Sequence, residues 1–283
     1  MTKIKIVTDS SCILTQEDIE KYNIHVVPLS VMIDGTIYTP PKNLTYEKFM
    51  ELMAESKSLP KTSQPPLGAF LELYEELTKD GSQVLSIHLT ESLSGTVETA
   101  KQAAKMVQGA ITVVDSAFVD QGTTFQVLKA AELAEKGSDL STILAEIKKV
   151  RDHTVLYLGL SSLENLVKGG RINRAVGLIS SFFNVKVVMQ MEHGDLFPKA
   201  KGRGDKTFAK WFEQLKTSLQ KQASDVARIG ISYAGDSGKE IVKKFKIELQ
   251  QILPDLEIPV VHTTPIVSTH TGPGAFAVIF YTK

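Results

Sequence analysis

Hydroxyl side chains gather where an apolar run is expected to end and a helix to begin. Residues 84–89 have the bulk of a buried strand. Ser94, Gly95 and Thr96 follow it and open a segment with helical spacing. The first turn of a helix leaves backbone N–H groups unpaired, and their partial positive charge attracts anions. We therefore predict an anion site at Ser94; the alternative for this residue is a helix N-cap beside a turn glycine.

Three other places carry groups that suit an acidic ligand. Thr62 and Ser63 lie in an expected loop stiffened by Pro65-Pro66, where they either donate to a ligand or cap the next helix. Arg171 follows two glycines that allow close backbone approach to a ligand, and its alternative is a solvated surface charge. His270 lies in an expected loop before the last strand, where it hydrogen-bonds an acid, moves a proton or is an ordinary turn residue.

The overall composition argues against several classes of partner and cofactor. Lys+Arg and Asp+Glu are balanced at 32 each, whereas nucleic acid and anionic membrane surfaces favour a basic surplus. The apolar runs are too short to span a bilayer, and the N-terminus enters a strand without a signal-peptide pattern. A single cysteine, Cys12, and histidines without ligand spacing predict neither a disulfide nor a metal site. The sequence also lacks a phosphate loop, a dinucleotide fingerprint and a Gly-x-Ser-x-Gly elbow. We expect a cytoplasmic protein without a cofactor.

The hydrophobic pattern predicts an α/β chain with two domains. Strand and helix patterns alternate through residues 1–155, which favours a mainly parallel sheet flanked by helices. Hairpins and helices mix in residues 156–283, which favours an α+β domain with a mixed sheet. Buried strands of the first domain are expected at 4–7, 24–33, 84–89 and 110–114.

Polar residues follow three of these strands. Thr8-Asp9-Ser10, Thr90-Glu91-Ser92 and Asp115-Ser116 stand where the strands end. Ligands of such sheets bind off the carboxyl ends of the strands. The three polar ends therefore predict one shared cleft.

Seven short motifs together resemble those of the DegV family, the fatty-acid-binding subunits of bacterial fatty acid kinase. Each motif is weak alone, but their common order over essentially the whole chain is specific. The motifs are Thr8-Asp9-Ser10, Val27-Pro28-Leu29, Thr62-Ser63-Gln64-Pro65, Ser92-Leu93-Ser94-Gly95-Thr96, Val114-Asp115-Ser116, Lys168-Gly169-Gly170-Arg171-Ile172 and His270-Thr271-Gly272-Pro273-Gly274.

The resemblance implies one fatty acid buried between the two domains, with its carboxylate held by hydroxyl groups. Thr62 and Ser94 hold the carboxylate in that family, and Arg171 and His270 lie near it. The implied ligand is a long-chain acid of roughly 16 to 18 carbons, whose tail contributes about 0.8 kcal/mol per buried CH₂. The full set of implied carboxylate-site residues is Thr62, Ser63, Ser94, Gly95, Thr96, Arg171 and His270.

The implied biochemistry is that of a lipid carrier without catalysis of its own. In the family a separate kinase phosphorylates the bound acid from ATP. The binding protein then carries the acyl-phosphate to an acyltransferase at the membrane surface, toward phospholipid synthesis. The basic-loop arginine, here Arg203, is implicated in working with the kinase.

Two other functions remain open at this point. Ser94 could be the nucleophile and His270 the base of an acyl-ester hydrolase, which requires a base within hydrogen-bond reach and an oxyanion hole. A weaker alternative is a regulator that senses acids through domain closure. Candidate tunnel residues, each of which could equally be ordinary core, are Leu178, Ile179, Phe182, Phe183, Ile266 and Phe276.

Overall fold

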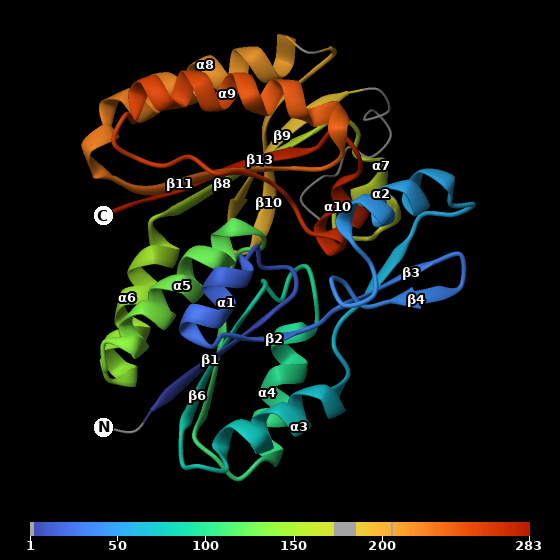
Figure 1. Ribbon diagram of the computed structural model, residues 1–283. Helices are drawn as coiled ribbons and strands as arrows, with labels where there is room; N and C mark the ends of the chain where they lie inside the picture. Colours follow the sequence, from blue (N-terminus) through green and yellow to red (C-terminus); the bar gives the residue numbers. More distant parts are fainter. Residues whose placement is uncertain (1–2, 173–184, 205) are drawn as a thin grey trace.

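The computed structural model describes residues 3–172, 185–204 and 206–283. Within these ranges the strands form three β-sheets, and Figure 1 shows the four-stranded sheet below the six-stranded one. The predicted fold class, a parallel sheet flanked by helices followed by a mixed sheet, is confirmed.

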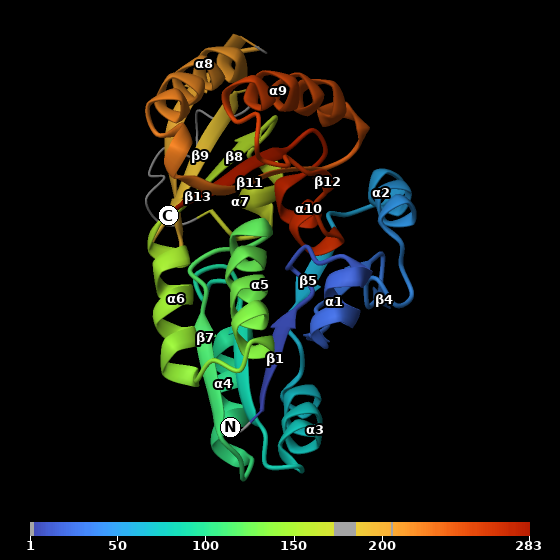
Figure 2. The same cartoon turned by 60° about the vertical axis from the view of Figure 1, so that its left-hand side comes forward.

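The four-stranded sheet is parallel throughout, in the order β2-β1-β6-β7. Helices α1, α5 and α6 pack on one face and α3 and α4 on the other (Figure 2). Adjacent residues of a strand point to opposite faces of the sheet, so Ile6 packs with residues of α5 and Val7 with residues of α3. The elements are β1 (Ile4–Asp9), α1 (Gln16–Tyr22), β2 (His25–Val27), α3 (Leu67–Thr78), β6 (Gln83–His88), α4 (Thr96–Met106), β7 (Ile111–Asp115), α5 (Gln121–Glu135) and α6 (Leu140–Asp152).

The expected single strand at 24–33 is wrong, because the chain breaks at Pro28-Leu29 and enters two sheets. β2 joins the parallel sheet, and β3 (Ser30–Ile33) begins a small antiparallel sheet in the order β4-β3-β5. β3 and β4 (Thr36–Tyr38) are joined by Asp34-Gly35, both at positive φ as a type I′ hairpin requires. α2 (Tyr46–Glu55) follows, and its Phe49 packs against this sheet.

Thr62 lies in a strand and not in the expected loop. Its strand, β5 (Lys61–Ser63), pairs with β3, and Thr62 stands opposite Val31. Thr62 and Ser63 therefore cap no helix; the N-cap of α3 is Pro66. The pairing with a strand distant in sequence decided this assignment, which local turn signals did not reveal.

The six-stranded sheet is mixed, in the order β10-β9-β8-β13-β11-β12. Only the β11–β12 pair is parallel among its described pairings. The chain enters this sheet at Thr154. The elements are β8 (Thr154–Leu160), α7 (Glu164–Lys168), β9 (Lys186–Glu192), β10 (Asp195–Gly202), α8 (Lys206–Lys221), η2 (Ala223–Asp225), β11 (Val226–Tyr233), η3 (Asp236–Gly238), α9 (Lys239–Ile252), β12 (Val260–His262), α10 (Pro265–Thr271) and β13 (Phe276–Thr282).

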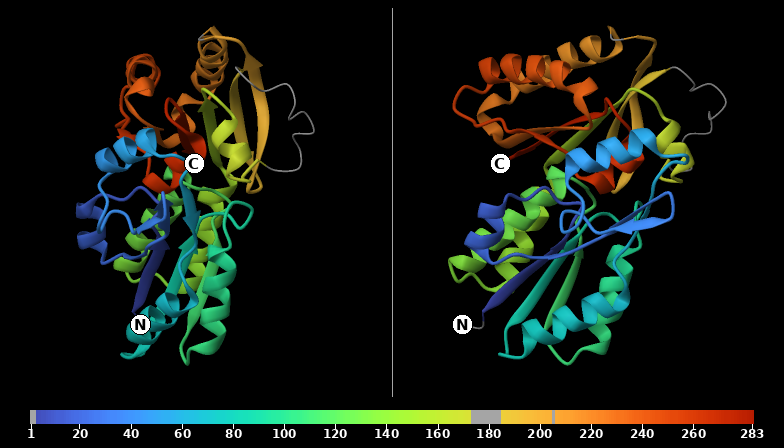
Figure 3. Two further views of the ribbon diagram at one scale, coloured as in Figure 1. Left: turned by 90° about the vertical axis from the view of Figure 1, so that its right-hand side faces the viewer. Right: turned by 45° about the vertical axis from the view of Figure 1, so that its right-hand side comes forward.

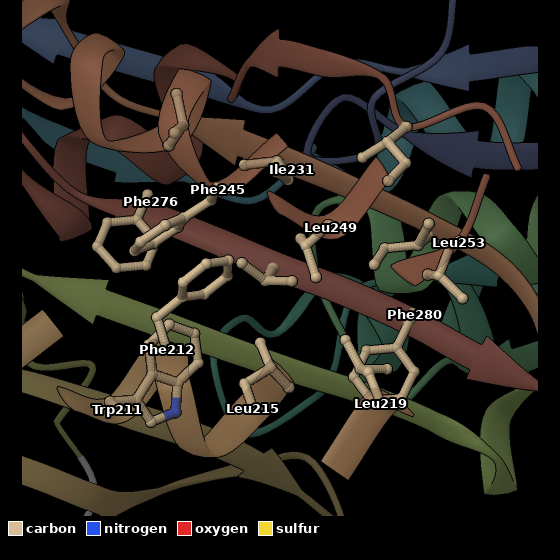
Figure 4. Close-up of a cluster of buried hydrophobic side chains, with 14 of the residues drawn as sticks. Trp211, Phe212, Leu215, Leu219, Ile231, Phe245, Leu249, Leu253, Phe276 and Phe280 are labelled. Carbon is tan, nitrogen blue, oxygen red and sulfur yellow. The ribbon is translucent and has the colours of Figure 1, made fainter. Parts of the chain in front are cut away.

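Helices α8 and α9 cover the outer face of this sheet with an aromatic core (Figure 4). Phe212 stacks on Phe245 with ring centroids 3.8 Å apart, and Trp211 and Phe276 pack beside them. The inner face of the sheet is aliphatic, with Ala277 of β13 and with Leu156 and Leu158 of β8. These three residues line a cavity between the sheet and the N-terminal half.

Helix α10 lies at the junction of the two halves (Figure 3). It contacts α2, β3 and β5 from the N-terminal half and α7 from the C-terminal half. His270 belongs to its last turn, so the expected loop position of this residue is wrong. Thr264 caps the helix and Pro265 occupies its first turn, which are ordinary helix-start signals, but the helix is short and depends on docking.

Candidate functional site

A cavity lies between the inner face of the six-stranded sheet and the carboxyl ends of the parallel strands, and its space, counted together with the solvent at its mouth, is about 790 Å³. Its wall is predominantly apolar, and both halves of the chain contribute. The apolar lining residues are Leu29, Leu89, Leu93, Val119, Leu156, Leu158, Leu166, Met191, Leu196, Ile266, Val267, Ala275, Phe276 and Ala277. A predominantly apolar cavity with a few polar side chains is typical of a binding site for an apolar ligand.

Four predicted site residues line this cavity from four separate elements. Thr62 comes from β5, Ser94 from the loop before α4, Arg171 from the segment after α7, and His270 from α10. Each element belongs to a different stretch of sequence, so the tertiary structure brings the four polar groups to one apolar cavity.

His270 is one of the side chains that join the two halves at this site. Its Nε2 is 2.8 Å from Thr62 Oγ1, and its Nδ1 is buried without a hydrogen-bond partner among the described residues. Burial, and secondly the positive charge of Arg171, lower the pKa of His270 from 6.5 to about 4. The imidazole is therefore neutral at physiological pH.

Gly169 permits the close approach of α7 to His270. A Cβ at this position would lie 2.4 Å from His270 Nδ1, which is sterically forbidden. Asn165 of α7 strengthens the contact by donating from Nδ2 to the Thr269 carbonyl at 3.0 Å. Gly169, the first of the two glycines before Arg171, thus serves packing between α7 and α10.

Arg171 lies half-buried, with its guanidinium directed at backbone carbonyls. Its Nε donates to the Leu93 carbonyl at 3.2 Å and its Nη1 to the Gly169 carbonyl at 2.6 Å. Burial lowers the pKa of Arg171, although the group stays cationic. Within residues 3–172, 185–204 and 206–283, no carboxylate forms an ion pair with it, so its charge remains available to an anion.

Ser94 precedes the N-cap of α4 and is not itself the cap, contrary to that alternative. The N-cap is Gly95, which has no side chain with which to cap the first-turn N–H groups. Ser94 Oγ lies 2.8 Å from Thr96 Oγ1, and Arg171 anchors the same loop through Leu93. The hydroxyl and the helix N-terminus thus lie together at the cavity, an arrangement suited to a carboxylate.

The other predicted site residues are not among those that line the cavity. Ser63 is exposed, because adjacent residues of β5 point to opposite faces. Gly95 is exposed, and Thr96 is buried and contacts Ser94. Arg203 is exposed just beyond β10.

Two of the candidate tunnel residues, Ile266 and Phe276, line the cavity. Leu178, Ile179, Phe182 and Phe183 lie outside the described residues. Sequence reasoning missed the buried polar lining residues Asp120 and Ser232, because neither stands in a recognisable motif.

The cavity lies off the carboxyl ends of the parallel strands, as the pattern predicts, but the polar residues at these strand ends do not line it. Asp9 is fully buried and accepts hydrogen bonds from Ser11 and from the Leu89 N–H, and it contacts His88 Nδ1 at 3.0 Å. Burial alone would raise the pKa of Asp9, but these contacts outweigh it and hold the pKa below its usual value. Asp115 accepts from the Glu91 and Ala117 N–H groups. These two carboxylates hold together, by hydrogen bonds, the loops behind the cavity wall.

His88 is a core histidine, as its place in a buried strand indicated. Ser86 Oγ, His88 and Asp9 follow one another in the order of a catalytic triad, with Ser86 Oγ 2.7 Å from His88 Nε2. All three side chains have 0% exposure, and the Tyr74 hydroxyl donates a hydrogen bond to Ser86 Oγ. A substrate cannot reach this serine.

The hydrogen bonds of Ser94 also count against hydrolysis. A serine nucleophile needs a base within hydrogen-bond reach. Among the described residues the hydrogen-bond partner of Ser94 Oγ is Thr96, whereas His270 Nε2 contacts Thr62.

Comparison with known proteins was decisive for the family. The model of a family described as “Uncharacterised protein, DegV family” matches residues 3–283. The chain belongs to the DegV family. It is 51% identical over 279 residues to a DegV domain-containing protein of Streptococcus pneumoniae serotype 4, covering 99% of this chain and 98% of that one. The family resemblance of the sequence motifs is thus confirmed.

Solved structures similar to this DegV protein include two described by their ligand. A DegV family protein from Thermus thermophilus, described for its fatty acid binding, is 31% identical with a TM-score of 0.89. DegV of Bacillus subtilis, described as a fatty acid binding protein, is 30% identical with a TM-score of 0.90. Each comparison covers 100% of both chains.

The described part of this DegV chain lacks two features. No helix in it combines the length and apolarity needed to cross a bilayer. Nor does it contain a group of three or more His, Cys, Asp or Glu side chains placed to hold a metal ion.

Proposed function

We propose that this DegV protein binds one long-chain fatty acid between a domain of residues 1–155 and a domain of residues 156–283. The acyl chain fills the apolar cavity, and the carboxylate binds at Thr62, Ser94, Arg171 and His270. The observation that carries this proposal is that these four polar side chains line one predominantly apolar cavity, where Thr62 Oγ1 lies 2.8 Å from His270 Nε2. The fatty acid binding of the Thermus thermophilus and Bacillus subtilis relatives supports it.

The chemistry of the carboxylate site suits an acid head group. Two hydroxyls donate, the N-terminus of α4 adds partial positive charge, and Arg171 supplies a full charge without an ion-pair partner among the described residues. His270 is neutral, so one ring nitrogen donates and the other accepts. Hydrogen bonds to a charged group contribute about 1.5–3 kcal/mol each, enough to select the head group.

The tail supplies most of the affinity in this proposal. Each buried CH₂ contributes about 0.8 kcal/mol, before the cost of ordering the chain is subtracted. Burial also keeps the acid out of the membrane, which makes a separate carrier useful.

We further propose that the protein is a carrier in the cytoplasm and not an enzyme. A separate fatty acid kinase phosphorylates the bound acid, and the protein then delivers the acyl-phosphate to an acyltransferase at the membrane surface for phospholipid synthesis. Arg203 serves the kinase interaction in this scheme, which fits its exposed position away from the cavity. Among the described residues the hydrogen-bond partner of Ser94 Oγ is Thr96, which is not a base, and this supports a non-catalytic role.

Native mass spectrometry after gentle purification tests the binding proposal. We expect a co-purified mass equal to a long-chain fatty acid, released by denaturation. The variant with Thr62→Ala and Ser94→Ala should lose that mass, whereas Ser141→Ala, an exposed hydroxyl in α6, should retain it. Absence of any acid from the native protein, with turnover of an acyl ester, would favour the hydrolase.

A further inference from the structure

A second polar cluster lines the same cavity, away from the carboxylate site. It consists of Asp120 at the start of α5, Ser232 near the end of β11 and Thr263 before α10. Thr263 Oγ1 donates to Asp120 Oδ2, and the Gln121 N–H donates to Oδ1 at 2.7 Å. Ser232 also acts to lower the pKa of the carboxyl. The cluster is buried, with Asp120 only 2% exposed.

Asp120 adopts a backbone conformation that is costly for its residue type. Its φ of 59° and ψ of −139° lie in a region favoured by glycine. Burial raises the pKa of Asp120, against the opposing hydrogen bonds of Thr263, the Gln121 N–H and Ser232. Both the backbone strain and the desolvation of the carboxyl oppose folding, so the residue needs another reason to be there.

Helix capping does not supply that reason. Another aspartate cap, Asp139 of α6, has an extended backbone at φ −73° and accepts from the Thr142 N–H in the first turn. Asp120 instead accepts from the immediately following Gln121 N–H. An ordinary cap would stabilise α5 without strain and without placing a carboxyl at the wall of an apolar cavity.

The cluster and the carboxylate site lie at opposite ends of α10. Thr263 precedes the helix, and His270 occupies its last turn. At a rise of 1.5 Å per residue the two positions are about 10 Å apart along the helix. An acyl chain whose carboxylate lies at His270 and which extends along this wall therefore passes the cluster part-way along its length.

We propose that the Asp120 cluster recognises a hydrogen-bonding oxygen on the acyl chain, so that the preferred ligand is an oxygenated long-chain acid, above all a hydroxy acid. This inference rests on the proposed fatty-acid binding and deepens it. The hydrogen bonds from Thr263 Oγ1 and the Gln121 N–H leave further lone pairs on the two oxygens of the Asp120 carboxyl. A ligand hydroxyl can donate to one of them, and the hydroxyls of Ser232 and Thr263 line the same wall. A chain of methylene groups alone offers these buried polar groups no hydrogen-bond partner, which is unfavourable.

Competitive binding to delipidated protein tests this proposal. The probes are stearic acid and a series of hydroxystearic acids whose single hydroxyl moves stepwise along the chain. We expect one mid-chain isomer to bind about tenfold more tightly than stearic acid, the effect of one net buried hydrogen bond. In Asp120→Gly that preference should disappear and stearic acid should gain affinity, because glycine suits the backbone at this position and removes the carboxyl. Asp139→Gly is the matched control, since it removes an exposed aspartate cap far from the cavity.

Each outcome decides between distinct explanations. If stearic acid binds the wild type at least as tightly as every hydroxystearic isomer, the inference is overturned while the fatty-acid proposal stands. If Asp120 serves only to hold α5 to Thr263 by their hydrogen bond, Asp120→Gly will change the affinity for every acid by the same factor. The ratio of the affinities for hydroxystearic and stearic acid then stays the same, and this result also overturns the inference. If no acid binds wild-type protein that melts cooperatively, the proposed function itself fails. Thr263→Val provides a second variant should Asp120→Gly not fold, and it should likewise reduce the preference.

Discussion

Lowering the pH should destabilise the delipidated protein through His270. Its pKa is about 4 in the folded protein, against 6.5 for an ordinary histidine. Between those two values the unfolded chain binds a proton that the folded chain does not, so the free energy of unfolding falls as the pH decreases through this window. The reason is structural: burial beside Arg171 opposes a charge on the ring.

The magnitude follows from the size of the pKa shift. At about 1.4 kcal/mol per pKa unit, the full loss for His270 is about 3 kcal/mol once the pH is well below 4. From about pH 7.5 to about pH 5 the loss is about 2 kcal/mol, because most unfolded histidine is then protonated and little of the folded form is. A bound carboxylate beside the ring favours its protonation, so lipid-loaded protein should lose less.

Urea denaturation at a series of pH values measures this effect. His270→Gln should show a pH dependence shallower than the wild type by about 2 kcal/mol over that range. The matched control is His193→Asn, which removes an exposed imidazole from the turn between β9 and β10 and keeps a residue tolerant of positive φ. Identical slopes for wild type and His270→Gln would refute the assignment of a buried neutral ring to His270.

Three other predictions address binding, kinase coupling and the core. Replacing both Thr62 and Ser94 by Ala should weaken long-chain acid binding at least ~100-fold, since each loses a hydrogen bond to a charged group; unchanged affinity in a fluorescence displacement assay would remove them from the site. Arg203→Ala should retain the lipid but slow its phosphorylation by the kinase subunit, and loss of lipid would show that its role is misplaced. Phe212→Ala should lower the free energy of unfolding by about 3–5 kcal/mol, because it empties the stacked position against Phe245, whereas a loss below about 1 kcal/mol in urea titration would contradict that packing.

Local patterns were sufficient for much of the secondary structure. The spacing of apolar residues predicts a helix at about 121–135, and α5 has these bounds. A hydroxyl residue followed by acidic residues predicts a helix start at Thr15, which caps α1, because capping involves only residues nearby in sequence. Asp34-Gly35 predicts a hairpin turn, which the structure contains, since the turn geometry depends on two adjacent residues.

Elements that depend on distant partners were missed or misplaced. β5 is three residues long and is a strand only because β3 lies beside it. The short helix α10 is held by contacts with α2, α7 and the small sheet. Neither the length nor the hydrophobic periodicity of such short segments distinguishes them from loops. The sequence pattern therefore predicts loops at Thr62 and His270.

The sequence by itself determined the types of chemical group available, the alternation of strand and helix, and the family, because composition, periodicity and ordered motifs are properties of the chain. Only the tertiary structure decided which groups meet. The contact between Thr62 and His270 spans 208 residues, and Asp120 reaches Thr263 across 143. Pairings of that separation are settled by how the two sheets and α10 pack together, and no local pattern encodes them.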